Sequence, residues 1–234
     1  MLADAVADLK MTKDRMMEFC LVEENHPDNI GASLYGGFIG SFLEMIDSTN
    51  TAASELNGQA ESTNKTSDAR YPKARARYFQ YPWSPAIKVI TIIPAYEVKT
   101  DSARAVLPAQ YDKAEVVFNL QRVAVLTHLL GQPTPNPTMI YKAMQDRLHQ
   151  QQRTDLVHGL EKLLQLTPDS LPGLLGICLS GAGPSILALA TNNFEQISEA
   201  IISVIQHSSP NPIHCDWRLL GPAEGGALLE HHPA

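Results

Sequence analysis

Four polar residues near position 26 could take part in catalysis or metal binding. His26, Asp28 and Asn29 share one short turn, and Glu18 lies two helical turns before His26. Mg²⁺ in proteins commonly binds one or two carboxylates and completes its shell with substrate phosphates and water. The spacing therefore allows a sparse magnesium site with polar contacts to a small substrate. A helix cap surrounded by solvated acidic side chains explains the same residues equally well.

Two arginines lie on separate predicted loops. Arg104 follows Thr100 in a polar segment, and Arg153 follows three glutamines. A guanidinium group can donate two parallel hydrogen bonds, so two converging arginines could hold a carboxylate or a phosphate. Each arginine taken alone is more simply a surface charge, and Arg147 and His149 are further candidates for the same site. No spacing in the chain suggests a Ser-His-Asp or Cys-His nucleophile.

A turn of small residues interrupts an apolar run between residues 174 and 190: Ser180-Gly181-Ala182-Gly183-Pro184-Ser185. Glycine permits positive φ and close approach of the backbone, so this turn could direct several backbone N–H groups toward an anion. A tight hairpin or a strand–helix turn without a ligand is the simpler interpretation. The turn has neither the Gly-Lys-Ser/Thr of a Walker A loop nor a dinucleotide-binding spacing.

The composition is typical of a globular protein and excludes several classes. The 234 residues are 44% hydrophobic, and the formal net charge of −7 argues against a protein dedicated to nucleic acid. Three widely spaced cysteines form no disulfide framework or zinc motif, and Cys20 and Cys178 are predicted to be core thiols. No apolar run has transmembrane length, and the N-terminus does not resemble a secretory signal. We therefore expect a cytoplasmic protein with no membrane partner.

The hydrophobic pattern predicts the elements that position these residues. Helices are expected over residues 1–22 (two parts meeting near Thr12), from about Ile30 to Gly36 with Asp28 or Asn29 as the cap, and over 115–130, 137–149, 154–166 and 193–206. In helix 115–130 the predicted apolar face carries Val116, Leu120, Val123 and Leu126 or Leu130. Strands are expected over residues 38–43, 86–93, 174–179, 186–190 and 212–220. This alternation favours an α+β fold with a ferredoxin-like second part.

Two segments depart from this regular pattern. Residues 47–80 are rich in Ser, Thr, Asn, Ala and Glu and are predicted to form an insertion or mobile loop. The end of that loop combines Arg70, Lys73, Arg75 and Arg77 with Tyr71 and Tyr78. A solvated loop end is favoured over a nucleic-acid or acidic-protein contact, because the rest of the chain is acidic. The first residues have the pattern of a helix interior without a cap, which suggests that the chain starts inside a domain.

Several separated motifs together resemble one family. They are His26-Pro27-Asp28-Asn29 followed by Gly36-Gly37, then Ala103-Arg104-Ala105-Val106-Leu107-Pro108, then Leu179 to Ser185. This order resembles homoserine kinase, a member of the galactokinase, homoserine kinase, mevalonate kinase and phosphomevalonate kinase superfamily. Met144-Gln145-Asp146-Arg147 and Phe118-Asn119-Leu120-Gln121-Arg122 add a likeness to the fungal form. The resemblance covers nearly the whole chain apart from the 47–80 loop.

The resemblance implies transfer of the ATP γ-phosphate to the side-chain hydroxyl of L-homoserine, with Mg²⁺, on the route to threonine. It implies that Glu18 is the magnesium ligand, with Glu24 as the fallback, and Asp28 is considered as the catalytic residue. The residues that it places around homoserine are His26, Asn29, Thr100, Arg104 and Arg153. The family's third motif is the turn that contains Ser180, Gly181, Ala182, Gly183 and Ser185, and it supports the substrate and phosphate region.

The chain also departs from the family pattern. It has no segment of the form Pro-x-x-x-Gly-Leu-Gly-Ser-Ser, the loop with which the family binds ATP phosphates. We therefore expect residues 1–82 to be an incomplete N-terminal kinase domain and residues 83–234 to be the C-terminal domain. We also expect little kinase activity from this polypeptide alone.

Two alternatives remain open. One is a non-catalytic homoserine-binding or interaction protein, which leaves room for a homodimer. The other is a superfamily kinase for a different small alcohol, although the pair Arg104 and Arg153 favours a substrate with an amino-acid carboxylate.

Overall fold

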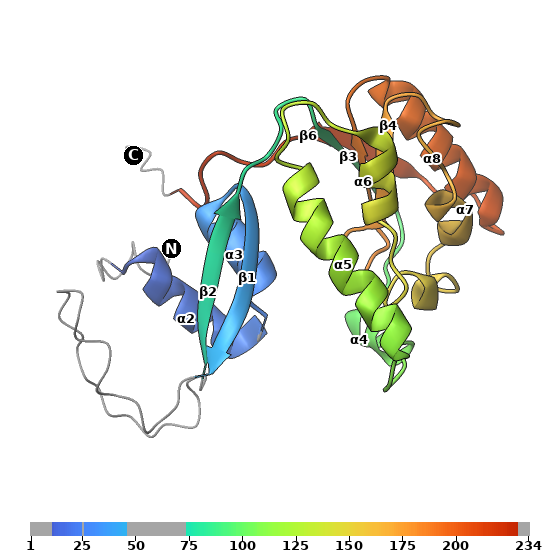
Figure 1. The fold of residues 1–234 in the computed structure, drawn as a ribbon. Helices are drawn as coiled ribbons and strands as arrows, with labels where there is room; N and C mark the ends of the chain where they lie inside the picture. The colour runs from blue at the N-terminus through green and yellow to red at the C-terminus, as the bar shows by residue number, and fades with distance from the viewer. Residues whose placement is uncertain (1–10, 25, 46–73, 229–234) are drawn as a thin grey trace, which may run out of the picture. The chain divides into compact units, whose positions relative to one another are not determined.

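The computed structural model describes residues 11–24, 26–45 and 74–228 (Figure 1). They form two units: the chain up to Tyr81 together with the segment from Pro222 onward, and residues Pro82–Gly221. The start of the predicted first helix and most of the predicted 47–80 loop lie outside the described residues. No helix in the described part of the chain is long and apolar enough to cross a lipid bilayer.

The first helix among the described residues is α2 (Lys13–Glu24). Its start agrees with the prediction, because the Thr12 hydroxyl oxygen accepts a hydrogen bond from the Arg15 backbone N–H at 3.2 Å. Met17 and Leu21, four residues apart, are buried on one face. The predicted core position of Cys20 is wrong, because this side chain lies off that face and is exposed.

Helix α3 (Pro27–Tyr35) begins earlier than the sequence pattern suggested. Pro27 occupies the first helical turn, where its fixed φ is favourable and its missing N–H costs nothing. The residue before it, His26, is extended and makes no side-chain cap, so the predicted cap at Asp28 or Asn29 is wrong. Gly36 ends the helix as predicted, with a φ of 73°.

Strands β1 (Phe38–Met45) and β2 (Ala74–Tyr81) form an antiparallel pair in which Phe38 faces Tyr81 and Met45 faces Ala74. The prediction that the loop extends to residue 80 is therefore wrong at its end. Arg75, Arg77 and Phe79 are alternate residues on one face of β2, as in any strand. The sequence did not predict this strand because basic residues replace the apolar ones that usually mark the pattern.

The C-terminal segment belongs to the first unit. The Gly37 N–H donates to the Ala223 carbonyl at 2.7 Å, and the Ala227 N–H donates to the Ser33 carbonyl at 2.8 Å. The predicted second domain, which ran to residue 234, therefore ends at Gly221 in the structure.

The second unit contains a four-stranded sheet in the order β4 (Leu174–Leu179), β5 (Ile186–Ala190), β3 (Lys88–Pro94) and β6 (Cys215–Leu220). Every neighbouring pair is antiparallel. Helices join β3 to β4, a tight turn joins β4 to β5, and α8 (Phe194–Ser208) joins β5 to β6. This order and connectivity confirm the ferredoxin-like prediction.

Helices cover both faces of β4 (Figure 1). Ile177 packs in a core with Ile201 of α8 and Leu163 of α7 (Leu160–Leu164). The preceding Gly176 faces Met144, which follows α6 (Pro137–Ala143). Adjacent strand residues point to opposite faces, so α6 lies on the side away from α7 and α8.

The tryptophans and three further helices complete the second unit. The Trp83 indole N–H donates to the Ile87 carbonyl at 3.0 Å, and Trp217 of β6 packs against the core. The remaining helices are α4 (Thr100–Ala105), α5 (Lys113–Leu129) and a short 3₁₀ helix, η1 (Gln151–Arg153).

Helix α5 corrects the predicted apolar face. Leu120 is 66% exposed and Val123 is 60% exposed, although both were expected in the core. The helix instead turns Phe118 and Asn119 toward the segment after α6, because that segment contains their polar partners.

The predicted helices 137–149 and 154–166 are too long, because the structure contains only the shorter α6 and α7 in their places. Between them the chain forms turns, because the Asp146 carboxylate binds backbone N–H groups that a helix would use internally.

Candidate functional site

Arg153 links two of the predicted site motifs in the second unit. It ends η1, and only 9% of the residue is exposed. Its Nε donates to the Ala103 carbonyl at 3.2 Å, and a terminal guanidinium nitrogen donates to the Gly181 carbonyl at 3.3 Å. One buried guanidinium thus joins helix α4, the Gly181 turn and the chain between α6 and α7.

The charge of Arg153 is not neutralised within the described residues. Its two hydrogen-bond partners are neutral carbonyls, and no ion pair in the described part of the chain joins it to a carboxylate. Burying an unpaired charge is costly, so buried arginines normally meet an anion. A ligand carboxylate or phosphate would supply the missing negative charge.

Helix α4 carries the other predicted contacts of this half of the site. Thr100 is its first residue and Arg104 lies in its last turn, and both are exposed. Ala103 is fully buried, which anchors the helix and places its carbonyl against Arg153. Arg104 is therefore the sequence neighbour of an Arg153 hydrogen-bond partner.

The Gly181 turn is the hairpin between β4 and β5. The Ser180 N–H donates to the Ser185 carbonyl at 2.9 Å, and the Gly183 N–H donates to the Ser180 carbonyl at 3.1 Å. Gly181 and Gly183 have φ angles of 58° and 85°, which favour glycine. The turn thereby presents the Gly181 carbonyl to Arg153, with Ala182 between the two glycines. The simpler interpretation, a tight hairpin, is correct for the backbone.

The remaining predicted site residues belong to the first unit. Glu18 lies on α2 and pairs with Arg15. Asp28 and Asn29 are exposed in the first turn of α3, where the Asp28 carboxylate accepts the Asn29 N–H at 2.7 Å. His26 and Glu24 are also exposed. Within the residues that can be described, no three His, Cys, Asp or Glu side chains gather as a cation site.

The sequence did not reveal a polar network beside the second-unit site. The Asn119 side-chain amide donates to the Asp146 carboxylate, which also accepts the N–H groups of Leu148, His149 and Gln150 at 2.9, 2.9 and 2.6 Å. Burial alone would raise the pKa of Asp146, but these hydrogen bonds outweigh it and hold the pKa below its ordinary value.

This network fixes the chain that leads to Arg153. It also connects the two sequence motifs that resemble the fungal form, because Asn119 belongs to one and Asp146 to the other. The available signal was a pair of polar residues, 27 positions apart, each inside a mostly apolar helical pattern.

Comparison with known proteins identifies close relatives. The chain is 47% identical to homoserine kinase of Saccharomyces cerevisiae over 238 residues, 42% identical to that of Candida albicans over 242 residues and 41% identical to that of Schizosaccharomyces pombe over 233 residues. The alignments cover 98%, 98% and 99% of this chain and 66%, 67% and 68% of the relatives. The chain therefore spans about two thirds of the length of these relatives. No family model matches it.

Solved structures confirm the fold. The crystal structure of homoserine kinase from Cytophaga hutchinsonii matches 96% of this chain with a TM-score of 0.69 at 23% identity, and the match covers 62% of that structure. A protein structure from Listeria monocytogenes matches the same share with a TM-score of 0.54 at 18% identity. The fold agrees with these structures, and the sequence identity to the three fungal enzymes shows that the chain belongs to the homoserine kinase family.

Proposed function

We propose that this chain supplies the substrate-binding residues for ATP-dependent phosphorylation of the side-chain hydroxyl of L-homoserine. The observation that carries the proposal is the buried Arg153 guanidinium, which has carbonyl partners and no carboxylate partner in the described structure. The α-carboxylate of homoserine would neutralise it, with Arg104 as the second cation. The names of the fungal relatives favour the enzyme over a non-catalytic binding protein.

The roles of the other residues follow from their chemistry. Asn29, His26 and Thr100 would contribute hydrogen bonds to the substrate, and Asp28 is the candidate to accept its hydroxyl proton. The Gly181 turn would orient Arg153 through its carbonyl. These assignments rest on the family motif and on the exposure of the four side chains.

ATP and Mg²⁺ are proposed as the co-substrate and the metal. Glu18 would hold the metal, since an oxygen donor of this kind suits Mg²⁺, and the contact with Arg15 orients its carboxylate. When bound, the metal neutralises charge that develops on the transferred phosphoryl group. We also propose a cytoplasmic location, with neither nucleic acid nor a membrane as partner.

The test is calorimetric titration of the chain with L-homoserine and with its amino-alcohol analogue, which lacks the carboxylate. We expect Arg153→Lys, which keeps the charge and loses the planar fork, to weaken homoserine binding about ten- to hundredfold. Arg104→Gln should also weaken it, and the exposed Arg218→Gln should not. The analogue should bind weakly to every form.

Equal binding of homoserine and the analogue would overturn the carboxylate assignment. ADP release with ATP, Mg²⁺ and homoserine tests the complete reaction separately. Mevalonate and shikimate serve as competing alcohol substrates, and preference for either would favour a different kinase of the superfamily.

A further inference from the structure

A cavity of about 550 Å³ lies in the second unit along β4, an edge strand of the sheet. Its walls come from α5, from α6 and the turns that follow it, from α7 and from β4, which are labelled in Figure 1. None of Arg104, Arg153 and Gly181 lines it. Four glutamines contribute much of the polar wall: Gln145, Gln150, Gln151 and Gln165.

One wall carries the Arg147 guanidinium, with Arg122 behind it outside the lining. The Asp146 carboxylate lines the cavity too, but its oxygens already accept hydrogen bonds from the Asn119 amide and from three backbone N–H groups. The Arg147 guanidinium lies 3.9 Å from the centre of the Phe118 ring, and the Arg122 guanidinium lies 3.1 Å from the same ring. No ion pair joins either arginine to a carboxylate among the residues with a described structure. Burial and the nearby Arg147 charge lower the pKa of Arg122. Two cations held together in this way favour an anionic ligand group.

Another wall carries the opposite charge. Glu161 of α7 lines the same cavity, and within the described chain it makes no ion pair. A carboxylate favours a ligand ammonium group. Because Arg147 and Glu161 both line the cavity, a ligand with a negative and a positive group could pair with both side chains, whereas a simple anion could pair with Arg147 only.

The free edge of β4 adds main-chain groups. The Gln150 side-chain oxygen accepts the outward-facing Leu179 N–H at 2.8 Å. Ile177 lies two residues earlier on the same strand and also lines the cavity. In an antiparallel strand its N–H and carbonyl therefore point to the same outer side as those of Leu179. These groups can bind the carboxylate or amine of an amino acid.

We infer that this cavity is a second ligand site, and that it binds a small zwitterion of the amino-acid type. The carboxylate would face Arg147 and the ammonium group would face Glu161, while the glutamines and Ile177 bind the remaining polar atoms. The inference does not depend on the proposed kinase function, because it uses other residues.

The test is NMR titration of the full chain with each proteinogenic L-amino acid, using the Arg104→Gln variant to weaken the proposed homoserine site. We expect one or more amino acids to shift amide signals around Ile177 and Gln150. Arg147→Gln and Glu161→Gln should each raise the dissociation constant at least about tenfold. The matched controls, Arg218→Gln and Glu199→Gln, lie outside the cavity and should leave the dissociation constant unchanged.

Decarboxylated and deaminated forms of the best ligand separate its two charges. Both should bind more weakly than the amino acid. Binding that depends on Arg147 alone would overturn the zwitterion assignment, and binding that survives both cavity variants would overturn the location. A chain that binds no amino acid at millimolar concentration would overturn the inference altogether. Each outcome is independent of ADP release.

Discussion

Arg153 is the residue on which the proposed site depends most. It is buried beside two carbonyl groups, which is an incomplete environment for a guanidinium charge until an anion arrives. The two hydrogen bonds of Arg153 hold the fold together locally, and its charge, unpaired among the described residues, is available to bind an anion.

Replacement of Arg153 separates these two contributions. Arg153→Gln should change the free energy of unfolding by less than about 1–3 kcal/mol, because removal of an unpaired buried charge offsets the donor that the Ala103 and Gly181 carbonyls lose. L-Homoserine should raise the midpoint of thermal unfolding of the wild type and should have little effect on the variant. Differential scanning calorimetry with and without homoserine provides the measurement. Equal ligand-induced shifts in both proteins would contradict the assignment.

Asp146 gives a prediction with a defined pH dependence. Asp146→Asn would replace one carboxylate oxygen by an NH₂ group, which cannot accept a hydrogen bond from a backbone N–H. We therefore expect the free energy of unfolding at neutral pH to fall by about 1–3 kcal/mol. The folded pKa is lower than the unfolded pKa. The stabilisation by the carboxylate is therefore full above the unfolded value, about 4, and is lost as the pH falls through the lower folded value.

The measurement is urea unfolding of the wild type and Asp146→Asn at neutral and strongly acidic pH. The difference in stability between the two proteins should shrink in acid. Asp169→Asn, at an exposed position outside this network, serves as the control and should show no such convergence. A constant difference at all pH values would contradict the carboxylate role.

At the scale of elements, the β4–β5 hairpin contains two glycines in different surroundings. A Cβ at Gly183 would lie 3.2 Å from a Val157 side-chain carbon, whereas a Cβ at Gly181 would meet nothing within 4 Å. Both residues have positive φ. Gly181→Ala should therefore cost about 1–2 kcal/mol from backbone strain alone, and Gly183→Ala should cost more. Chemical denaturation of the two variants compares them directly, and equal losses would argue against the Val157 contact.

The close approach of α6 to β4 predicts a coupled pair of substitutions. A Cβ at Gly176 would lie 2.5 Å from the Met144 sulfur. Gly176→Ala should destabilise the second unit by about 1–3 kcal/mol through overpacking, and part of this loss should disappear in a Met144→Ala background. A double-mutant cycle on urea unfolding measures the coupling. Additive effects would show that the contact does not determine the spacing between helix and strand.

The elements that the sequence predicted well are those with one dominant hydrophobic period. Strands β3, β4 and β5 and helix α8 lie near their expected positions because apolar side chains alone define them. Helix α5 was placed correctly, but its buried face depends on Asn119, whose partner Asp146 is distant in sequence. The end of the 47–80 segment was missed because its strand alternates charged with aromatic residues, and only pairing with β1 determines its conformation.

The candidate site was predictable to a similar degree. The motifs identified Arg104, Arg153 and the Gly181 turn, and the structure joins Arg153 to α4 and to that turn. The burial of Arg153 and the Asp146 network could not be predicted, because both depend on contacts between segments that the sequence does not show to be neighbours.

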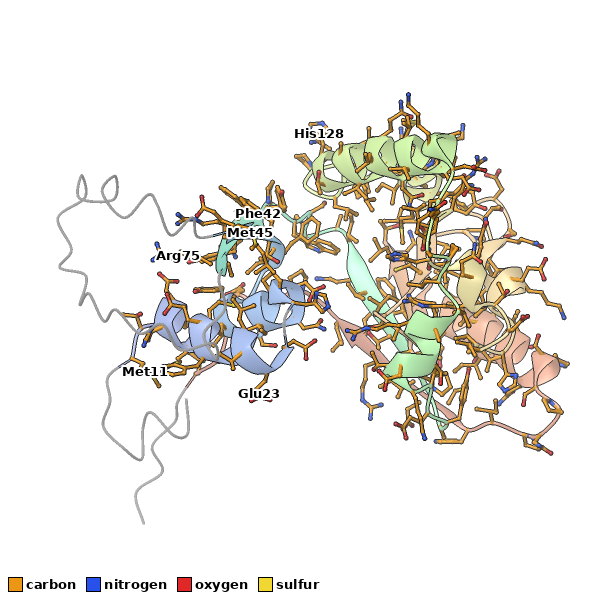
Figure 2. All side chains as sticks on the ribbon, turned by 90° about the horizontal axis from the view of Figure 1, so that it is seen from below. Met11, Glu23, Phe42, Met45, Arg75 and His128 are labelled. Atoms are coloured by element: carbon orange, nitrogen blue, oxygen red, sulfur yellow. The ribbon has the colours of Figure 1, made fainter. Side chains whose placement is uncertain are left out.

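At the scale of the whole molecule, the first unit has aromatic residues on an exposed face of its two-stranded sheet. Phe42 is 52% exposed and Phe79 is 58% exposed, with ring centres 6.4 Å apart, and Figure 2 labels Phe42 on β1. Phe79→Thr keeps strand propensity and should change the free energy of unfolding by less than about 1 kcal/mol. It should reduce binding of a hydrophobic dye. Dye fluorescence at matched concentrations checks this, and unchanged binding would show that the face does not attract apolar ligands.

The positions of the indole side chains have a practical consequence for spectroscopy. Both tryptophans of the chain, Trp83 and Trp217, belong to the second unit, while the first unit contains tyrosine and phenylalanine as its aromatic residues. Emission excited at the red edge of the indole band therefore monitors the second unit alone, whereas far-ultraviolet circular dichroism monitors both. If the two signals change at different denaturant concentrations, the units melt independently, and the unlabelled protein reports which of them loses its structure first.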